Sequence, residues 1–230
     1  MKSDIYKIDN SVEKVLHGKN TLFLDGNELM LVKSKLKNIP YNIYYPYIDS
    51  EKVIIYTKDI PKVSLFKIKS YGKLRHQDIL GSILSLNISS SYLGDIIVDD
   101  DNYYFYIMNE LSDFIRENLL IIGSNKVVLE EIPLDLMSDY QRKYKDYEII
   151  VSSLRIDNIL SKIVGTNRNS ILDIIKNKEV MLNYNILTKS SYILKENDIF
   201  SIRRIGKFKF VGVVNHTKKD NLIVKYLKYV

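Results

Sequence analysis

The clearest hydrophobic pattern lies in the last third of the chain. Between Ser153 and Val164, apolar residues recur at intervals of three and four. They are Ile156, Ile159, Leu160, Ile163 and Val164. This spacing predicts a helix with one buried stripe. A second, shorter helix is predicted next, with Thr166 or Asn167 as its cap and a buried face formed by Ile171, Ile174 and Ile175.

Beyond these helices the hydrophobic period changes to two. Val180 and Leu182 alternate with polar neighbours, and a turn is expected at 183–185. The stretch 199–204 alternates again. Alternation predicts strands, so two helices are expected to lead into a small sheet. A C-terminal strand extension is expected over 208–230.

The first forty residues read as helical. Asp25 is placed to cap a helix that runs to Leu36, and Pro40 follows as a helix terminator. From Tyr41 onward the pattern becomes mixed, which predicts that a second kind of domain begins there.

Strands and helices are predicted to alternate from Tyr41 to Met137. Two strands come first, at 44–47 and 53–56. From Val63 the order is strand, helix, strand, strand, helix, strand, over the segments 63–69, 77–86, 95–98, 103–108, 111–119 and 126–131. This βαββαβ order is the ferredoxin-like order, which RNA-recognition motifs also use.

These patterns predict an α+β protein with three units. They are a helical N-terminal segment over 1–40, a ferredoxin-like domain over 41–137, and a domain of two helices and a small sheet over 152–230. The polar segment 138–151, which contains Gln141-Arg-Lys-Tyr-Lys145, is predicted to be a linker.

Composition narrows the chemistry. The chain has 230 residues, 46% hydrophobic and 27% charged, which is typical of a globular protein. No apolar run approaches the roughly 18 residues of a membrane span, and the polar start is unlike a signal peptide, so we expect a cytosolic protein without membrane contact. The absence of Cys excludes disulfides, thiol catalysis and cysteine-ligated zinc. We expect neither a metal nor a cofactor.

Charge is distributed unevenly along the chain. Residues 152–230 hold 15 Lys and Arg against six Asp and Glu, a net charge of +9. The remaining residues hold 19 against 22, a net charge of −3. A positive region of this kind is the electrostatic footprint that nucleic-acid binding requires.

The order and spacing of elements after Ser153 resemble the S4 module of ribosomal protein S4, RNA-modifying enzymes and heat-shock protein 15. Two positions depart from that pattern. Lys178 stands where the family has Gly, and we expect Asn177 to take the left-handed conformation instead. Asn197 replaces the Gly before Asp198, which is a mild change because Asn tolerates that conformation.

The S4 resemblance implies contacts to RNA phosphates. From the helix pair these would come from Arg155, Arg168, Lys176 and Lys178, with Ser170 adding a hydrogen bond. From the strand side they would come from Arg203, Arg204, Lys207 and Lys209. Such a surface suits double-stranded RNA, which is recognised mainly through its shape and backbone.

A second resemblance lies in the middle of the chain. His76, Asp78, Leu80 and Gly81, followed by Gly94, Asp95 and Ile96, resemble the His-x-Asp-x-Leu-Gly and Gly-Asp-Ile segments of the YlmH family of S4 proteins. The resemblance covers nearly the whole chain. It implies a bacterial, ribosome-associated quality-control factor, acting as a monomer, with ribosomal RNA, tRNA and the large ribosomal subunit as partners.

Catalysis is not expected. Phosphate-loop, dinucleotide and His-Glu-x-x-His motifs are absent from the sequence. Leu154-Arg-Ile-Asp157 resembles a pseudouridine synthase signature, but Asp157 is expected to be a first-turn charge aligned with the helix dipole. Asp99–Asp101 is expected to form a hairpin turn. The alternatives are an RNA-modifying enzyme of the S4-containing pseudouridine synthase type and a cell-division-linked adaptor.

The tyrosines of the run 103–106 allow two interpretations. Alternation places Tyr104 and Tyr106 on one face of the predicted strand, and Tyr103 and Phe105 on the other. Exposed aromatics on this strand stack on bases in RNA-recognition motifs. We expect packing rather than stacking, because the middle domain has no surplus of basic residues.

Overall fold

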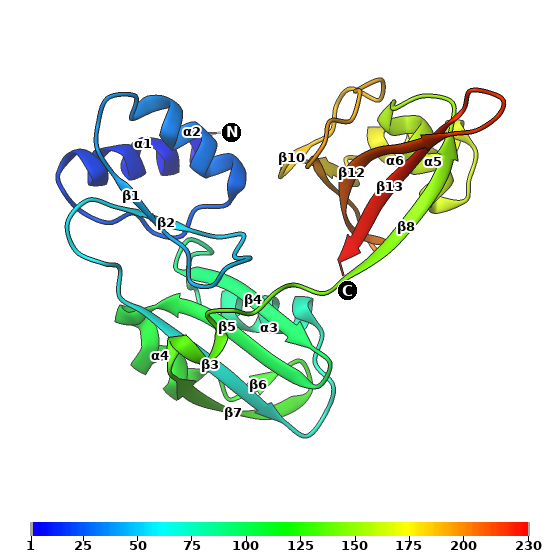
Figure 1. Ribbon diagram of the computed structural model, residues 1–230. Helices are drawn as coiled ribbons and strands as arrows, with labels where there is room; N and C mark the ends of the chain where they lie inside the picture. Colours follow the sequence, from blue (N-terminus) through cyan, green and yellow to red (C-terminus); the bar gives the residue numbers. More distant parts are fainter. Residues whose placement is uncertain (1, 230) are drawn as a thin grey trace. The chain divides into compact units, whose positions relative to one another are not determined.

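The computed structural model describes residues 2–229 (Figure 1). The chain separates into two compact units, with the boundary between Gln141 and Arg142. This boundary lies inside the segment that we predicted to be a linker. The two units are therefore considered one at a time.

Unit 1 begins with two helices, α1 (Lys2–Leu16) and α2 (Gly26–Lys35). The predicted cap of α2 is confirmed, because the Asp25 carboxylate accepts the backbone N–H groups of Asn27 and Glu28 at 2.9 Å each. The Glu28 carboxylate in turn accepts the Asp25 N–H at 3.0 Å, which completes a capping box. Two short strands, β1 (Asn42–Tyr44) and β2 (Ile54–Tyr56), form an antiparallel pair.

The main sheet of unit 1 follows. Its elements are β3 (Val63–Ser70), α3 (His76–Ser85), β4 (Leu93–Asp99), β5 (Asn102–Met108), a 3-10 turn (Asn109–Leu111), α4 (Ser112–Asn118), β6 (Ile121–Ile122) and β7 (Asn125–Ile132). The predicted succession of strands and helices is confirmed, with β6 as an unpredicted addition. The sheet order is β4-β5-β3-β7-β6, so β3 and β5 pair at its centre. The turn between β4 and β5 uses the predicted acidic run, with Asp100 at φ 54°.

The helices α3 and α4 cover one face of this sheet (Figure 1). Their isoleucines Ile79, Ile83 and Ile115 pack with Phe66 and Phe105 in a fully buried cluster. The alternation along β5 explains the arrangement, since Tyr103 and Phe105 face the helices while their neighbours face away.

Part of the opposite face is covered by the N-terminal region. Phe23 and Tyr47 pack on Leu65 and Tyr106 there, together with Met137 from the segment after β7. The Tyr47 and Tyr106 rings are stacked, with centroids 5.5 Å apart. Tyr106 is therefore a core residue, as the packing interpretation predicted, whereas Tyr104 is half-buried.

The Gly-Asp-Ile segment of β4 has a structural explanation. A Cβ atom on Gly94 would lie 2.8 Å from atoms of Phe23 and Tyr106, so only glycine fits this close approach. The buried Asp95 carboxylate accepts the Tyr47 hydroxyl and the Glu51 N–H, both at 2.7 Å. The segment thus joins the N-terminal region to the sheet.

Unit 2 has two helices and one antiparallel sheet. The elements are β8 (Tyr144–Val151), α5 (Ile156–Val164), α6 (Arg168–Lys176), β9 (Val180–Leu182), β10 (Asn185–Ile186), β11 (Ile199–Ile202), β12 (Gly206–His216) and β13 (Leu222–Tyr229). The sheet order is β10-β9-β11-β12-β13-β8. The two predicted helices are confirmed, and their isoleucines pack on Phe200, Phe208 and Phe210.

Two predictions for this unit differ from the structure. Most of the predicted linker is β8, which pairs along its whole length with β13, from Tyr144 opposite Tyr229 to Val151 opposite Leu222. The strand went unpredicted because most of its side chains are exposed and three of the eight are charged, which hides any alternation. The expected C-terminal extension is the hairpin β12–β13, and its last predicted residue, Val230, lies outside the described residues.

Candidate nucleic-acid interface

The starts of α5 and α6 meet at a buried carboxylate. Asp157, in the first turn of α5, is completely buried and accepts hydrogen bonds from two arginines. Arg155 donates from Nε at 3.2 Å and from its terminal nitrogen at 2.7 Å. Arg168, the first residue of α6, donates from Nε at 3.1 Å and from its terminal nitrogen at 2.7 Å. We call these three residues the Asp157 cluster.

The electrostatics of this cluster favour a charged Asp157. Burial alone would raise the pKa of Asp157, but hydrogen bonds and charge from Arg155 and Arg168 outweigh burial and hold that pKa below its ordinary value of 3.8. Two guanidinium groups against one carboxylate leave a net charge of +1. The arginine side chains remain 36% and 55% exposed, so the surplus charge faces solvent.

The turn between the two helices adds backbone donors. Gly165 ends α5 with φ 71°, a left-handed conformation that suits glycine. Asn167 caps α6 by accepting the Ser170 N–H at 2.9 Å, as predicted, and also the Ser170 hydroxyl at 3.2 Å. Ser170, predicted as an RNA contact, therefore already has a partner in the helix cap. The start of α6 carries Arg168 over the positive end of its helix dipole.

A second basic group lies where α6 leads into the sheet. Lys176 is in the last turn of α6 and is exposed. The Arg203 N–H donates to the Glu179 carbonyl at 2.9 Å, which brings Lys178 close along the backbone to Arg203 and Arg204. These four basic residues are all exposed.

One prediction about this group is wrong. Lys178 itself adopts the left-handed conformation, with φ 60°, whereas Asn177 has φ −74°. The helix therefore ends where the family pattern places Gly, and the strain falls on a lysine. The companion prediction is confirmed, because Asn197 has φ 69°.

The last two predicted contacts lie on a different surface. Lys207 and Lys209 alternate along β12 with Phe208 and Phe210, which face the helices. Both lysines therefore lie on the sheet face away from α5 and α6. The structure thus brings Arg155 and Arg168 together, and separately the group around Arg203, but leaves Lys207 and Lys209 on the far face.

Aromatic residues around Lys207 were missed in the sequence. Its Nζ lies 5.0 Å from the ring centroid of Tyr184 and 4.8 Å from that of Tyr229. Tyr144 packs edge-on against Tyr229 at 5.0 Å. Alternation along the last strand could have indicated Tyr229, whereas Tyr184 reaches Lys207 from a turn with φ 66° that no local pattern reveals.

Three aspartates, Asp78, Asp95 and Asp157, have structural partners. Asp78 accepts Nε and a terminal nitrogen of Arg75 at 2.8 Å each. Asp95 and Asp157 are buried in the arrangements described above. Across residues 2–229, no group of three or more His, Cys, Asp or Glu is placed to hold a metal ion. Within the same residues, no helix is long and apolar enough to cross a membrane.

Known proteins with similar sequences or structures were found for this chain. Residues 59–136 match the family model described as "Putative RNA-binding domain in YlmH". A curated protein of Bacillus subtilis (strain 168), "Ribosome-associated protein quality control protein P2", is 25% identical over 231 residues, covering 94% of this chain and 89% of that protein. A solved structure, "Cell division protein ylmH from Streptococcus pneumoniae", is 24% identical, with a TM-score of 0.49 over 60% of this chain and 94% of its own.

The matched range contains the His76–Gly81 and Gly94–Ile96 segments. The family model and the Bacillus subtilis relative agree with the predicted resemblance, so the chain is similar to YlmH-type proteins.

Proposed function

We propose that the protein is a non-catalytic RNA-binding factor that docks on structured RNA through unit 2. The observation that carries the proposal is the Asp157 cluster. A buried carboxylate holds two arginines at adjoining helix starts, within the part of the chain that carries a net charge of +9. Guanidinium groups held in place lose little side-chain entropy when they bind a phosphate.

The chemistry of this surface suits an RNA backbone. Arginine forms paired hydrogen bonds to phosphate oxygens, and helix starts add positive potential. Of the five N–H donors of a guanidinium, Arg155 and Arg168 each direct two toward Asp157. The remaining donors are the ones we assign to phosphate.

The partner we propose is ribosomal RNA of the large subunit, with tRNA nearby. Support comes from the match to a family model described as an RNA-binding domain and from the name of the Bacillus subtilis relative. In this proposal unit 2 is an S4 domain that starts at β8, and the domain from Val63 is ferredoxin-like. The sheet order β4-β5-β3-β7 supports that second assignment.

The competing enzymatic function, pseudouridine synthesis, would use Asp157 as the nucleophile. A carboxylate with no exposed surface, held by two arginines, is poorly placed to reach a uridine. We therefore assign Asp157 a positioning role.

The test compares two charge reversals in the full chain. We call the basic residues of unit 2 that are proposed to contact RNA the footprint. Arg203→Glu with Arg204→Glu reverses two charges of this footprint, whereas Lys218→Glu with Lys219→Glu makes the same charge change in the β12–β13 turn. Binding of a hairpin RNA is measured over a range of salt concentrations. The first variant should bind much more weakly, with a log–log salt slope reduced by about 0.7 to 0.9 for each lost phosphate contact. Equal losses in the two variants would show that only net charge matters, and would contradict the proposed footprint.

A further inference from the structure

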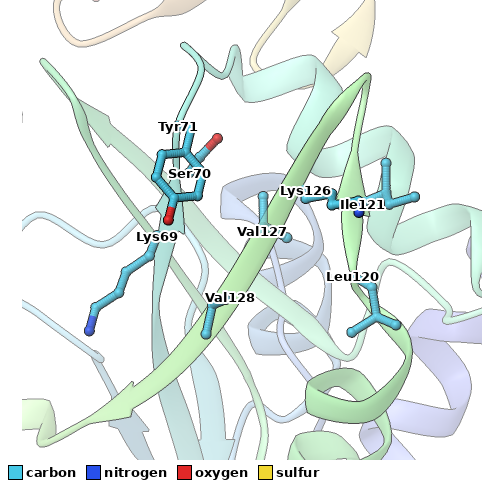
Figure 2. Close-up of a pocket in the computed structure, with 8 residues that line it drawn as sticks. All are labelled: Lys69, Ser70, Tyr71, Leu120, Ile121, Lys126, Val127 and Val128. Atoms are coloured by element: carbon cyan, nitrogen blue, oxygen red, sulfur yellow. The ribbon is translucent and has the colours of Figure 1, made fainter.

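Unit 1 has a groove at the end of its five-stranded sheet, with a volume of about 840 Å³ (Figure 2). Its apolar lining includes Tyr71, Leu120, Ile121 and Val128, and Lys69 and Lys126 also line it. Figure 2 shows that these side chains come from three neighbouring segments, the end of β3, β6 and β7. A groove of this size is large enough for a small organic group such as a nucleobase.

Strand register identifies the sheet face on which the groove opens. Lys67 pairs with Tyr104 on one side and with Glu130 on the other, so these three side chains share a face. Two positions further along, Lys69 pairs with Val128 on the same face. This is the face away from α3 and α4, and it is the one that also carries Tyr106.

One half of this face is covered and the other is open. Around Tyr106 the N-terminal region buries the strands, as described above. Around the groove large apolar side chains are exposed instead, with Tyr71 fully exposed and Val128 65% exposed. Leu120 and Ile121 are more than half exposed. A concentrated apolar patch of this kind marks a binding surface more often than an inert one.

The charged residues around the groove indicate what kind of ligand it binds. Unit 1 carries more acidic than basic residues, but the open half of this face carries Lys67, Lys69 and Lys126 against Glu130 and Asp99. Glu130 forms an ion pair with Lys69 at 2.9 Å. A surplus of one positive charge therefore remains on this half of the face, and Lys69 and Lys126 line the groove itself. Apolar surface ringed by lysines is complementary to bases flanked by phosphates.

We infer that this groove binds unpaired bases of single-stranded RNA, with Tyr71 as the stacking platform and Lys69 and Lys126 facing the phosphates. The inference rests on the proposed function, since it gives an RNA-binding protein a second contact of a different kind. All the groove residues fall within the matched range 59–136. Unit 2 would recognise folded RNA by its backbone, and the groove would hold an adjoining single strand by its bases.

The experiment uses the full chain and two probes, a labelled 12-nucleotide oligouridine and the hairpin RNA of the preceding test. Tyr71→Ala should weaken oligouridine binding by roughly 5- to 150-fold, which is the range for loss of one stacked base, with little change in salt slope. Tyr71→Phe keeps the ring and should bind like the parent. Tyr6→Ala is the matched control, because Tyr6 is 74% exposed on α1, outside the groove.

A second measurement localises the strand directly. Oligouridine carrying 4-thiouridine, irradiated with the full chain, should crosslink to peptides containing Tyr71 or residues 120–128. Crosslinks confined to residues beyond Gln141 would overturn the inference. Unchanged oligouridine affinity in Tyr71→Ala, with unchanged thermal unfolding, would also overturn it, and would be the outcome if a protein occupies the groove.

The two proposals fail separately. If Tyr71→Ala binds oligouridine as well as the parent does while Arg203→Glu with Arg204→Glu loses the hairpin, only the groove inference fails. If the hairpin binds equally to both charge-reversal variants while oligouridine binding depends on Tyr71, the proposed footprint in unit 2 fails and the groove inference stands.

Discussion

Each unit begins its first sheet-covering helix with an arginine and an aspartate, and the two pairs have different environments. In unit 1, Arg75 and Asp78 at the start of α3 lie at the surface, with the arginine side chain 70% exposed. In unit 2, Asp157 at the start of α5 has no exposed surface and holds a second arginine from the next helix. The exposed pair caps one helix, whereas the buried carboxylate ties two helices together.

This difference matters because burial decides what an ion pair contributes. An exposed pair gains little, since water screens it and two flexible side chains must be ordered. A buried carboxylate cannot remain without partners, so its arginines are held in position at all times. Both places have an arginine shortly before an aspartate at a helix start, and the surrounding core makes the difference.

The largest effect is expected from Asp157→Ala. Removing the carboxylate deletes four hydrogen bonds to charged donors and leaves a buried space, so unit 2 should lose on the order of 3 kcal/mol of unfolding free energy. Chemical denaturation followed by tyrosine fluorescence measures this, since the chain has no Trp. A loss no larger than that of Asp78→Ala would mean that the Asp157 cluster is not structural.

The second prediction concerns how the stability that Asp157 contributes depends on pH. The folded-state pKa of Asp157 lies below its ordinary value of 3.8, so its stabilisation is complete at neutral pH and is lost as the pH falls through the folded-state pKa. The stability difference between the parent and Asp157→Asn should therefore shrink below about pH 4. Denaturation curves at several pH values test this, and a difference that stays constant down to pH 2 would contradict it.

A smaller effect is expected from Arg168→Ala on RNA binding. If Arg168 contacts one phosphate, the log–log salt slope for hairpin RNA should fall by about 0.7 to 0.9. Arg75→Ala removes the same side chain from the exposed pair and serves as the control, with an unchanged slope. Equal slopes for Arg168→Ala and the parent would remove Arg168 from the footprint.

The smallest effect is expected from Asp78→Ala. The pKa of Asp78 is lowered by its hydrogen bond to Arg75, but both groups lie at the surface, so the thermal midpoint should move only slightly. Differential scanning calorimetry of the full chain measures this shift in the thermal midpoint. A shift comparable to that of Asp157→Ala would remove the contrast between the two pairs.

Local patterns predicted the helices and most of the strands, because the buried stripe of a helix and the alternation of a strand both depend only on residues close together in the sequence. They also predicted Asp25 and Asn167 as caps, since a cap needs only residues two or three positions away. They missed β8, because its pairing with β13 is not local and its exposed residues carry no alternation.

The basic residues of the candidate site could be predicted from the sequence, but their positions relative to one another could not. The basic residues of unit 2 stood out from charge and motif, but the role of Asp157 depends on Arg168, which is brought to it by the turn between two helices. The left-handed conformation of Lys178 was missed because asparagine is the better residue for it, and the neighbouring helix end overrides that preference. The separation of Lys207 and Lys209 from the helix pair follows only from the sheet.

The pairing of β8 with β13 also constrains the order in which unit 2 can form. Tyr144 pairs with Tyr229, 85 positions later, so the first strand of unit 2 to be synthesised has no partner until the last strand follows. During that interval β8 is an open edge that could pair with another chain. Lys145, Asp146 and Glu148 place three charged side chains along it, which protects the nascent strand against such pairing.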